Sequence, residues 1–333
     1  MERKPANTML SIAATLLLLA AAFAAQKFLN AYVLRILNLC AIYAILGVSM
    51  NLINGFTGQF SLGHAGFMAV GAYVTAILTL SPASKATIYF MEPIMPPLDR
   101  IHLSFFPALV IAGLISALFG LMIGVPTLRL KGDYLAIATL GFSEIIRVVF
   151  TNIVPITNGA LGLKNIPEHT TLLWSCGWMI FTIFFIQRLV NSSYGRAMKG
   201  IRDNEVAAEA MGVNLFTHKI LAFVVGAFFA GIGGGLLANL ITTIDPKTFT
   251  PVLTYQVLMI IVVGGLGSIS GTVVSAGIFA VLMEYLRPLD NVIPGLRMVF
   301  FSVLLMVVVL FARQGLMGGR EFCWDWILQR KTE

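Results

Sequence analysis

The stretch ILAFVVGAFFAGIGGGLLANLI, at residues 220–241, has the length and character of a helix that crosses a lipid bilayer. It carries no charged side chain. At a helical rise of about 1.5 Å per residue it would extend roughly 33 Å, close to the thickness of the hydrocarbon core. Similar apolar runs recur from Met9 to Ala312. The sequence therefore predicts an all-α protein that crosses the membrane many times.

The composition agrees with this interpretation. Of the 333 residues, 58% are hydrophobic and 11% are charged, and the mean hydropathy is +0.89, far more apolar than a soluble domain. The formal net charge of +7 could favour nucleic acid, but the basic residues form no stripe interleaved with aromatic residues. We therefore expect a lipid bilayer around most of the chain and no nucleic-acid partner.

Apolar windows divided at glycine, proline and charged positions predict about ten spans, several of them interrupted by glycine. They lie near residues 8–26, 36–53, 60–80, 103–125, 134–152, 172–190, 218–242, 252–268, 271–287 and 295–312. The first run, which follows Arg3 and Lys4, also resembles a signal peptide. We favour an uncleaved first helix because further spans follow directly. Since the polar segments are short, we expect a single transmembrane domain over residues 1–333.

The distribution of positive charge favours one orientation. With both termini in the cytoplasm, most of the 22 lysines and arginines fall in the inside segments. The longest polar interruption, residues 191–217, then also lies in the cytoplasm. The longest outer loops would be residues 81–102 and 153–171, and several prolines predict irregular structure in the first of them.

The long cytoplasmic segment contains SSYGRAMKGIRDNEVAAEAMGVNLFTHK, which predicts a short exposed helix over about residues 204–211. Asp203 or Asn204 can cap its first turn, Glu205 lies where the helix dipole favours an anion, and Gly212 suits the left-handed position after the last turn. Two helical turns are marginally stable in water. Either the helix is a solvated connector, or a partner protein holds it.

The segment NGFTGQFSLGHAGFMAVGAY, at residues 54–73, combines glycines with polar side chains at membrane depth. Gly58 and its neighbours loosen or interrupt a helix, while Gln59, Ser61 and His64 add polar groups. Irregular backbone inside a bilayer needs protein or water around it. The segment could line a cavity in which a broken helix attracts a carboxylate. Alternatively, its glycines serve helix packing, with Ser61 and His64 bonded to neighbouring carbonyls.

Glu144 and Arg147 lie three residues apart on the predicted span 134–152, so they share one helix face and can form an ion pair. Charges inside a membrane are uncommon enough to be candidates for a functional site. The pair could bias a conformational step. We favour a structural ion pair at an interface packed with protein, because the pair lies near the outer end of its span.

Glycines spaced four residues apart predict close helix packing at three places. They are Gly120 and Gly124, Gly231 and Gly235, and Gly267 and Gly271. A weak internal similarity also relates residues 55–73 to residues 264–282, as in transport folds with pseudo-symmetry, although composition alone explains it equally well.

No pattern in the sequence predicts an enzyme. GGLGS at residues 264–268 lacks the Lys-Ser/Thr ending of a phosphate-binding loop, and GxxxxGK[ST] occurs nowhere. Ser61 and His64 lack an orienting acid and a GxSxG context. The three cysteines lack metal-ligand spacing, so we expect free buried thiols and no metal site. They are Cys40, Cys176 and Cys323.

Five segments, in the same order, resemble the LivM-type branched-chain amino acid permeases. They are NGFTGQFSLGHAGFMAVGAY, LRLKGDYLAIATLGFSEIIR, SYGRAMKGIRDNEVAAEAMG, VVGGLGSISGTVVSA and FARQGLMG. EVAAEAMG at 205–212 resembles the EAA-type coupling motif, but its glycine lies seven positions after the glutamate instead of six. The family's TGG-like signature is TNGALGL at 157–163, where Asn158 replaces a glycine.

The resemblance implies one permease half of an ATP-binding-cassette importer in the bacterial inner membrane, which moves leucine, isoleucine or valine by alternating access. The implied partners are a second, LivH-like permease subunit, two cytoplasmic ATPase subunits that bind ATP and Mg, and a periplasmic binding protein. The coupling residues would be Arg202, Asp203, Glu205, Ala208, Glu209 and Gly212. The residues that we assign to the translocation path are Gly58, Gln59, Ser61, His64, Asn158 and Gly159.

Three other functions stay open at this point. Permeases for urea or short amides resemble the same segments. An ion-coupled secondary transporter would need paired acids at membrane depth, for which Glu144 and Glu284 are the candidates. A channel would need a selectivity ring or a carbonyl filter, and neither is visible.

Overall fold

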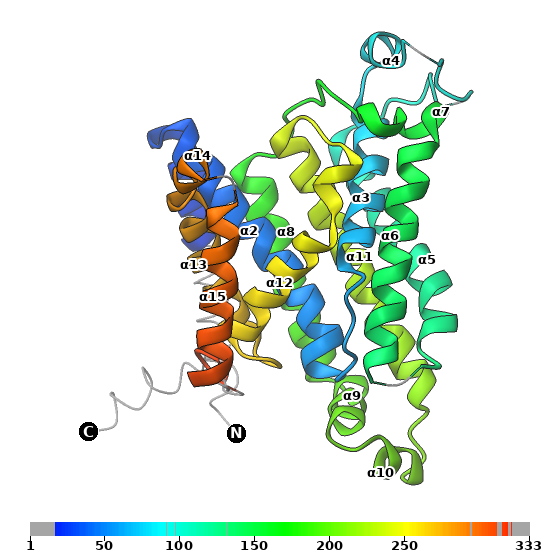
Figure 1. Ribbon diagram of the computed structural model, residues 1–333, viewed down its shortest axis with the longest axis vertical. Helices are drawn as coiled ribbons and strands as arrows, with labels where there is room; N and C mark the ends of the chain where they lie inside the picture. The colour runs from blue at the N-terminus through cyan, green and yellow to red at the C-terminus, as the bar shows by residue number, and fades with distance from the viewer. Residues whose placement is uncertain are drawn as a thin grey trace.

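The computed structural model describes residues 17–90, 92–96, 98–130, 132–293, 295–311, 315–318 and 321. Over these residues the chain forms helices, with one isolated β-bridge between Leu163 and Ile244 (Figure 1). The prediction of an all-helical, polytopic protein is confirmed. Both termini, the first part of the predicted span 8–26 and Cys323 lie outside the described residues, so the predicted side of the termini stays a prediction.

The long helices follow the predicted apolar runs. They are α2 (Ala31–Asn51), α3 (His64–Thr79), α5 (Phe105–Thr127), α6 (Asp133–Asn152), α8 (Leu172–Val190) and α11 (Leu215–Ile241). Shorter apolar helices are Leu17–Phe28, α12 (Pro251–Gly264), α13 (Ile269–Tyr285) and α15 (Leu296–Phe311). The connections contain the π-helix η1 (Leu52–Phe56), α4 (Pro82–Ile88), α7 (Val154–Thr157), η2 (Gly159–Leu161), α9 (Ser193–Asp203), α10 (Glu205–Ala210), η3 (Pro246–Phe249) and α14 (Leu289–Val292).

Five of the described helices are long and apolar enough to cross a bilayer: α2 with η1, α5, α6, α8 and α11. A sixth crossing results if α3 and α4, which meet at a bend of 118°, count as one broken span. α12 and α13 are apolar but shorter. The number of ten spans therefore stays a prediction, and the described helices are consistent with five or six crossings.

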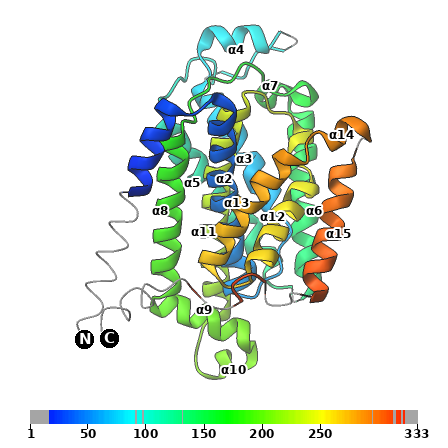
Figure 2. The ribbon, with the colours of Figure 1, turned by 90° about the vertical axis from the view of Figure 1, so that its left-hand side faces the viewer.

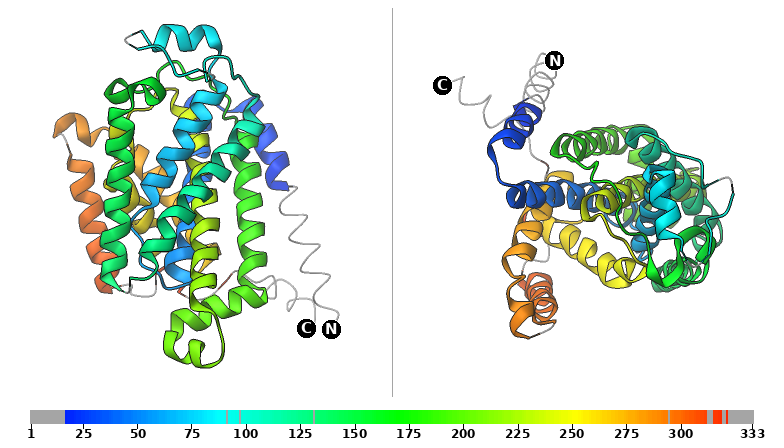
Figure 3. Two further views of the ribbon diagram at one scale, coloured as in Figure 1. Left: turned by 90° about the vertical axis from the view of Figure 1, so that its right-hand side faces the viewer. Right: turned by 90° about the horizontal axis from the view of Figure 1, so that it is seen from above.

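The helices run between two ends of the molecule. α4 and α7 lie at one end, and α9 and α10 lie at the other (Figures 1 and 2). Seen from above, α13 and α15 lie on the side away from α5 and α6 (Figure 3). α11 packs against α2, α3 and α5, and it is one of the two most buried spans, so it forms the centre of the helix cluster.

Glycines allow α11 to lie unusually close to its neighbours. A Cβ added at Gly71 of α3 would lie 2.1 Å from the Gly231 carbonyl oxygen, and one added at Gly234 would lie 2.1 Å from the Met68 carbonyl oxygen. A Cβ at Gly231 or Gly235 would also clash with a side-chain hydroxyl of a facing helix. The predicted packing role of the glycine pair in α11 is confirmed.

The loop at residues 81–102, predicted to be irregular and to lie outside, contains the helix α4. Ser81 caps this helix by accepting a bond from the Ser84 nitrogen, 3.2 Å away. The buried Lys85 donates to the carbonyl oxygens of Leu98 and Ile101, at 2.7 and 2.6 Å. Burial lowers the pKa of Lys85, while the nearby Asp99 raises it. These bonds fold the loop into a compact cap over one end of the helices.

Candidate functional site

The chain between α2 and α3 departs from the α-helix for about a dozen residues. α2 passes into the π-helix η1, and residues 57–63 are then non-helical until α3 begins at His64. Gly58 has a φ of 71°, and the main-chain nitrogen of Gln59 donates to the Ile53 carbonyl oxygen at 3.0 Å. The predicted interruption is present, and this turn places the start of α3 at residue 64, four residues after the approximate start of the predicted span 60–80.

Protein groups surround the irregular backbone. The Asn54 side chain bonds the main chain of Ser61 at both its amide atoms, each at 3.3 Å. The Leu62 nitrogen donates to the Thr139 hydroxyl at 3.0 Å, and the Ala65 nitrogen donates to the Thr254 hydroxyl at 3.0 Å. The segment is therefore held between α6 and α12, as irregular backbone in a bilayer requires.

The polar side chains of this segment differ in their partners. His64 is buried, and its Nε2 lies 3.0 Å from the Ser49 hydroxyl, so it bonds a hydroxyl instead of a carbonyl. Gln59 is only 3% exposed, and neither of its amide atoms has a hydrogen-bond partner within the described part of the chain. A buried amide without a partner costs about 1–3 kcal/mol, so Gln59 is available to water or to a polar substrate.

Four further buried polar atoms without a hydrogen-bond partner among the described residues lie on or beside the contact between α3 and α6. They belong to Tyr73, Ser143, Glu144 and Asn158, while the remaining two, of Asp99 and Arg297, lie elsewhere. The two helices touch along their length. A Cβ at Gly66 would lie 3.0 Å from the Ser143 Cα, and the rings of Tyr73 and Phe150 are 4.9 Å apart. We call this contact the α3–α6 seam; the sequence analysis did not single out Tyr73 or Ser143.

Asn158 and Gly159 follow α7, at the end of the molecule that also carries α4 (Figure 1). Gln59 lies in the segment before α3, at the other end of that helix. Asn158 has a left-handed backbone, with a φ of 59°, and its Nδ2 donates to the Gly162 carbonyl oxygen at 2.8 Å. A Cβ at Gly159 would lie 3.1 Å from the Thr151 carbonyl oxygen of α6. The six predicted path residues therefore form two groups, at the two ends of the α3–α6 seam.

At the opposite end, two short helices connect α8 to α11. Asn204 is the N-cap of α10, with its Oδ1 3.0 Å from the Ala207 nitrogen, and Gly212 is left-handed, with a φ of 82°. Of the two predicted caps the structure contains Asn204, because Asp203 is the last residue of α9. The sequence analysis missed α9, although Ser192 precedes it as a capping residue.

The predicted coupling residues face different ways. Glu205 of α10 forms an ion pair with Lys219 of α11, and Ala208, also in α10, is buried. Asp203, Glu209 and Gly212 are exposed. Two apolar side chains also project into solvent, since Val206 is 75% exposed and Met211 is 84% exposed. α10 is therefore fixed to the protein through Glu205 and Ala208, while Val206 and Met211 project into solvent.

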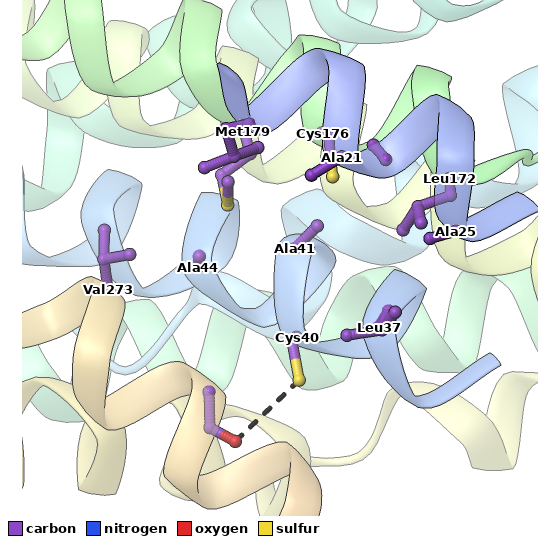
Figure 4. Close-up of a pocket in the computed structure, with 13 residues that line it drawn as sticks. Ala21, Ala25, Leu37, Cys40, Ala41, Ala44, Leu172, Cys176, Met179 and Val273 are labelled. Atoms are coloured by element: carbon purple, nitrogen blue, oxygen red, sulfur yellow. Dashed lines mark hydrogen bonds between the residues drawn. The ribbon is translucent and has the colours of Figure 1, made fainter. Parts of the chain in front are cut away.

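Pockets of about 310, 570 and 730 Å³ lie among the described helices. The pocket of about 730 Å³ is apolar and is lined mainly by α8. The other two contain thiols or charged groups. One of about 310 Å³ is almost entirely apolar and lies between Leu17–Phe28, α2, α8 and α13 (Figure 4). It contains the free thiols of Cys40, which is half-buried, and Cys176, which is buried. The other, of about 570 Å³, is polar and includes Arg35, Asn38 and Glu168. Sequence reasoning missed the polar cavity because its residues come from distant segments.

The family model of the branched-chain amino acid transport system permease component matches residues 32–310. The chain belongs to this permease family. It is 31% identical to the high-affinity branched-chain amino acid transport system permease protein LivM of Salmonella typhimurium and 32% identical to LivM of Escherichia coli, in both cases over 85% of this chain and 69% of the relative. No solved structure matches it.

A more distant relative is LivH of Escherichia coli, named as a permease protein of the same high-affinity branched-chain amino acid transport system. It is 21% identical over 84% of this chain and 92% of its own length. Transport systems of this kind therefore contain two related permeases, and this permease is more similar to LivM than to LivH.

Glu144 and Arg147 of α6 form the predicted ion pair. Nε and Nη2 of Arg147 donate to Glu144 Oε2 at 2.8 and 2.6 Å, and each side chain is 31% exposed. α6 is the least buried of the five long spans. Among the described residues, no three His, Cys, Asp or Glu side chains come together as metal ligands.

We expect the ion pair between Glu205 and Lys219 to stabilise the permease by about 1.5–3 kcal/mol, because Lys219 is only 10% exposed and the bond is charge-assisted. Glu205→Gln, Lys219→Met and the double variant should show this coupling energy in a double-mutant cycle of thermal unfolding in detergent. The exposed pair Asp99–Arg100, whose closest atoms are 3.9 Å apart, is the control, with an expected coupling below about 0.5 kcal/mol. Additive effects of Glu205→Gln and Lys219→Met would contradict the prediction.

Proposed function

We propose that this permease is a membrane subunit of an ATP-driven importer of leucine, isoleucine or valine in a bacterial inner membrane. It would act with a second, LivH-like permease subunit, two cytoplasmic ATP-binding-cassette ATPases and a periplasmic binding protein. The observation that carries the proposal is the family match over residues 32–310, together with relatives named LivM and LivH. ATP and Mg would be bound by the ATPases, so this chain would need no cofactor of its own.

α10 is the proposed contact with an ATPase subunit. Its ion pair with Lys219 and the burial of Ala208 fix it to the protein, while Val206, Glu209 and Met211 are exposed. Exposed apolar side chains on a short helix are typical of a protein contact. The end of the molecule with α9 and α10 would then lie in the cytoplasm, which agrees with the charge-based orientation.

The α3–α6 seam is proposed to line one side of the path along which the substrate crosses the membrane. Gln59, Tyr73, Ser143 and Asn158 have buried polar atoms that can bond the charged groups of an amino acid as it moves between the two ends. The apolar side chain of a branched-chain amino acid would pay no desolvation penalty against the apolar side chains around these atoms. Alternating access would expose first the Asn158 end and then the Gln59 end.

The end of the molecule opposite α9 and α10 is the proposed docking site of the binding protein. It contains α4 and α7, which are joined by a hydrogen bond from the Tyr89 hydroxyl to the Ile156 carbonyl oxygen. Burial raises the pKa of Tyr89, so the hydroxyl stays a donor at physiological pH. A rigid outer surface favours docking of a preformed partner.

Uptake of labelled leucine by vesicles that contain the permease and its partner subunits tests the proposal. We expect uptake to require both internal ATP and the binding protein. We also expect isoleucine and valine to compete with leucine for uptake. Uptake driven by an ion gradient without ATP would overturn the proposal. ATP-dependent uptake of urea or an amide, with no uptake of leucine, would support the proposed importer architecture but show that the substrate is not a branched-chain amino acid.

A second experiment concerns α10 alone. Val206→Asp with Met211→Asp should reduce ATP-dependent uptake and recovery of the ATPase with the purified permease by more than about tenfold, because both positions would lie in the contact. The fold should be unaffected, since both side chains are exposed. Val206→Ile with Met211→Leu is the matched control and should keep uptake. Full uptake by the aspartate variant would exclude this face as the ATPase contact.

A further inference from the structure

Arg202 connects the cytoplasmic helices to the irregular membrane segment. It is the penultimate residue of α9, and its Nη1 donates to the Gly55 carbonyl oxygen of the π-helix η1 at 3.3 Å. Its Nε and Nη2 bond Asp203 Oδ1 at 3.0 and 2.9 Å. One side of the guanidinium thus stays with α9, while the other reaches the membrane segment.

Two glycines make room for this side chain. A Cβ at Gly58 would lie 2.9 Å from Arg202 Cγ, and a Cβ at Gly267 would lie 3.0 Å from Arg202 Nη1. Both glycines have a positive φ, of 71° and 82°. Gly58 precedes Gln59 directly, and Gly267 belongs to the turn between α12 and α13. Arg202 therefore lies between two turns that are far apart in the sequence.

These two turns are also joined to each other. The fully buried Asn51 accepts from the Gly267 nitrogen at 2.9 Å and donates to the Ser268 carbonyl oxygen at 2.9 Å and to the Thr272 hydroxyl at 2.8 Å. A Cβ at Gly55 would lie 2.5 Å from the Gly267 nitrogen, so the two backbones are in direct contact. The end of α2, η1 and the start of α13 form one packed unit, with Arg202 against its cytoplasmic side.

A π-helix has a looser hydrogen-bond geometry than an α-helix and frequently occurs at functional sites. Here η1 lies directly before Gln59, the buried amide at one end of the α3–α6 seam. A second cation of α9 also faces η1, since Lys199 Nζ lies 5.8 Å from the centre of the Phe56 ring. A displacement of α9 would thus act on the residues immediately before Gln59.

We propose that Arg202 is a positioning residue that transmits the movement of α9 and α10 to η1, and so sets the position of Gln59. This inference rests on the proposed function, because the movement would come from the ATPase that contacts α10. A guanidinium suits this role, since its planar fork can hold Asp203 and the Gly55 carbonyl at the same time, whereas an ammonium is a single point of contact. The Arg202 side chain is 37% exposed, and in this proposal it acts on η1, while α10 contacts the ATPase.

The test uses the complete importer with Arg202→Met, Arg202→Lys and the control Arg196→Met. Arg196 lies on the same helix, is exposed and makes one long bond, of 3.4 Å, to the Asn191 carbonyl oxygen. We expect the Arg202→Met complex to assemble, with leucine transported per ATP hydrolysed reduced by at least about fivefold. Arg202→Lys should recover part of the loss, and Arg196→Met should match the unchanged protein.

A second readout separates transmission from a merely structural role. Gln59→Cys is introduced into a permease whose three native cysteines are replaced by serine, and its rate of labelling by a small thiol reagent is measured with and without ATP. We expect ATP to change this rate in the parent complex and to leave it unchanged when Arg202→Met is added.

The outcomes distinguish the two proposals. If the parent importer shows no ATP-dependent uptake, the proposed function fails and this inference fails with it. If the parent importer transports leucine and Arg202→Met keeps the same transport per ATP and the same ATP-dependent labelling, only the role of Arg202 is overturned. Loss of the ATPase from the Arg202→Met complex would also overturn it, because Arg202 would then act in docking.

Discussion

Replacing Gly71 by alanine is expected to lower the free energy of unfolding of the permease by about 3 kcal/mol, the upper end for an overpacked core. The new Cβ would lie 2.1, 2.4 and 2.5 Å from the oxygen, Cα and carbonyl carbon of Gly231. These are backbone atoms, which cannot rotate away as a flexible side chain can. The only relief is to move α3 from α11, and the central helix would then lose contact with its neighbours.

Thermal unfolding in detergent, followed together with the yield of monodisperse protein, measures this effect. Gly141→Ala is the matched control, because Gly141 also lies within a helix but has no heavy atom within 4 Å of the added Cβ. That variant should be neutral or more stable by up to about 1 kcal/mol, the helix preference of alanine over glycine. Equal melting temperatures for Gly71→Ala and Gly141→Ala would show that the two helices separate without cost.

The second large effect is expected for Asn51→Leu, with a loss of about 3 kcal/mol. Leucine keeps the size of the side chain but removes three hydrogen bonds, and the buried nitrogen of Gly267 loses the amide oxygen that accepts from it. Because these bonds join α2 to the turn before α13, the loss should also loosen the contact between the two helices.

Hydrogen exchange of residues 264–272, measured beside thermal unfolding, would locate the change. Asn152→Leu is the control, since Asn152 is exposed and its single side-chain bond, to the Val148 carbonyl oxygen, stays within its own helix. Its effect should remain within about 0.5 kcal/mol. If Asn51→Leu lowered the free energy of unfolding no more than Asn152→Leu, the turn between α12 and α13 would be held by its glycine backbone instead of by the Asn51 amide.

The sequence alone predicts the helices whose boundaries are set by composition. α8 occupies residues 172–190, as predicted, because polar residues follow its apolar run directly. The cap at Asn204 and the left-handed Gly212 were also readable, since both depend on the intrinsic preferences of a single residue. The prediction that glycines serve packing held for α11, where small residues are the condition for close contact between helices.

Features that depend on distant partners could not be read in this way. The π-helix η1 and the delayed start of α3 are stabilised by Asn54, Thr139 and Thr254, whose positions are known only after folding. α9 was not predicted as a separate helix because the only local break between it and α10 is the extended backbone of Asn204, with a φ of −160°. The unpaired atoms of Tyr73 and Ser143 likewise become visible only when α3 and α6 are placed together.

The π-helix η1 has a consequence for how this permease can change over evolution. One π turn holds about one residue more than the α turn that it replaces, which corresponds to an inserted residue accommodated inside a helix. The buried face of α2 can therefore keep its helical register, while the chain that leaves it is turned by roughly a quarter of a revolution. Losing that one residue would rotate the exit of α2 without altering any contact upstream of Asn51. A single deletion there would redirect Gln59, and it would also displace Gly55 from its contacts with Gly267 and Arg202.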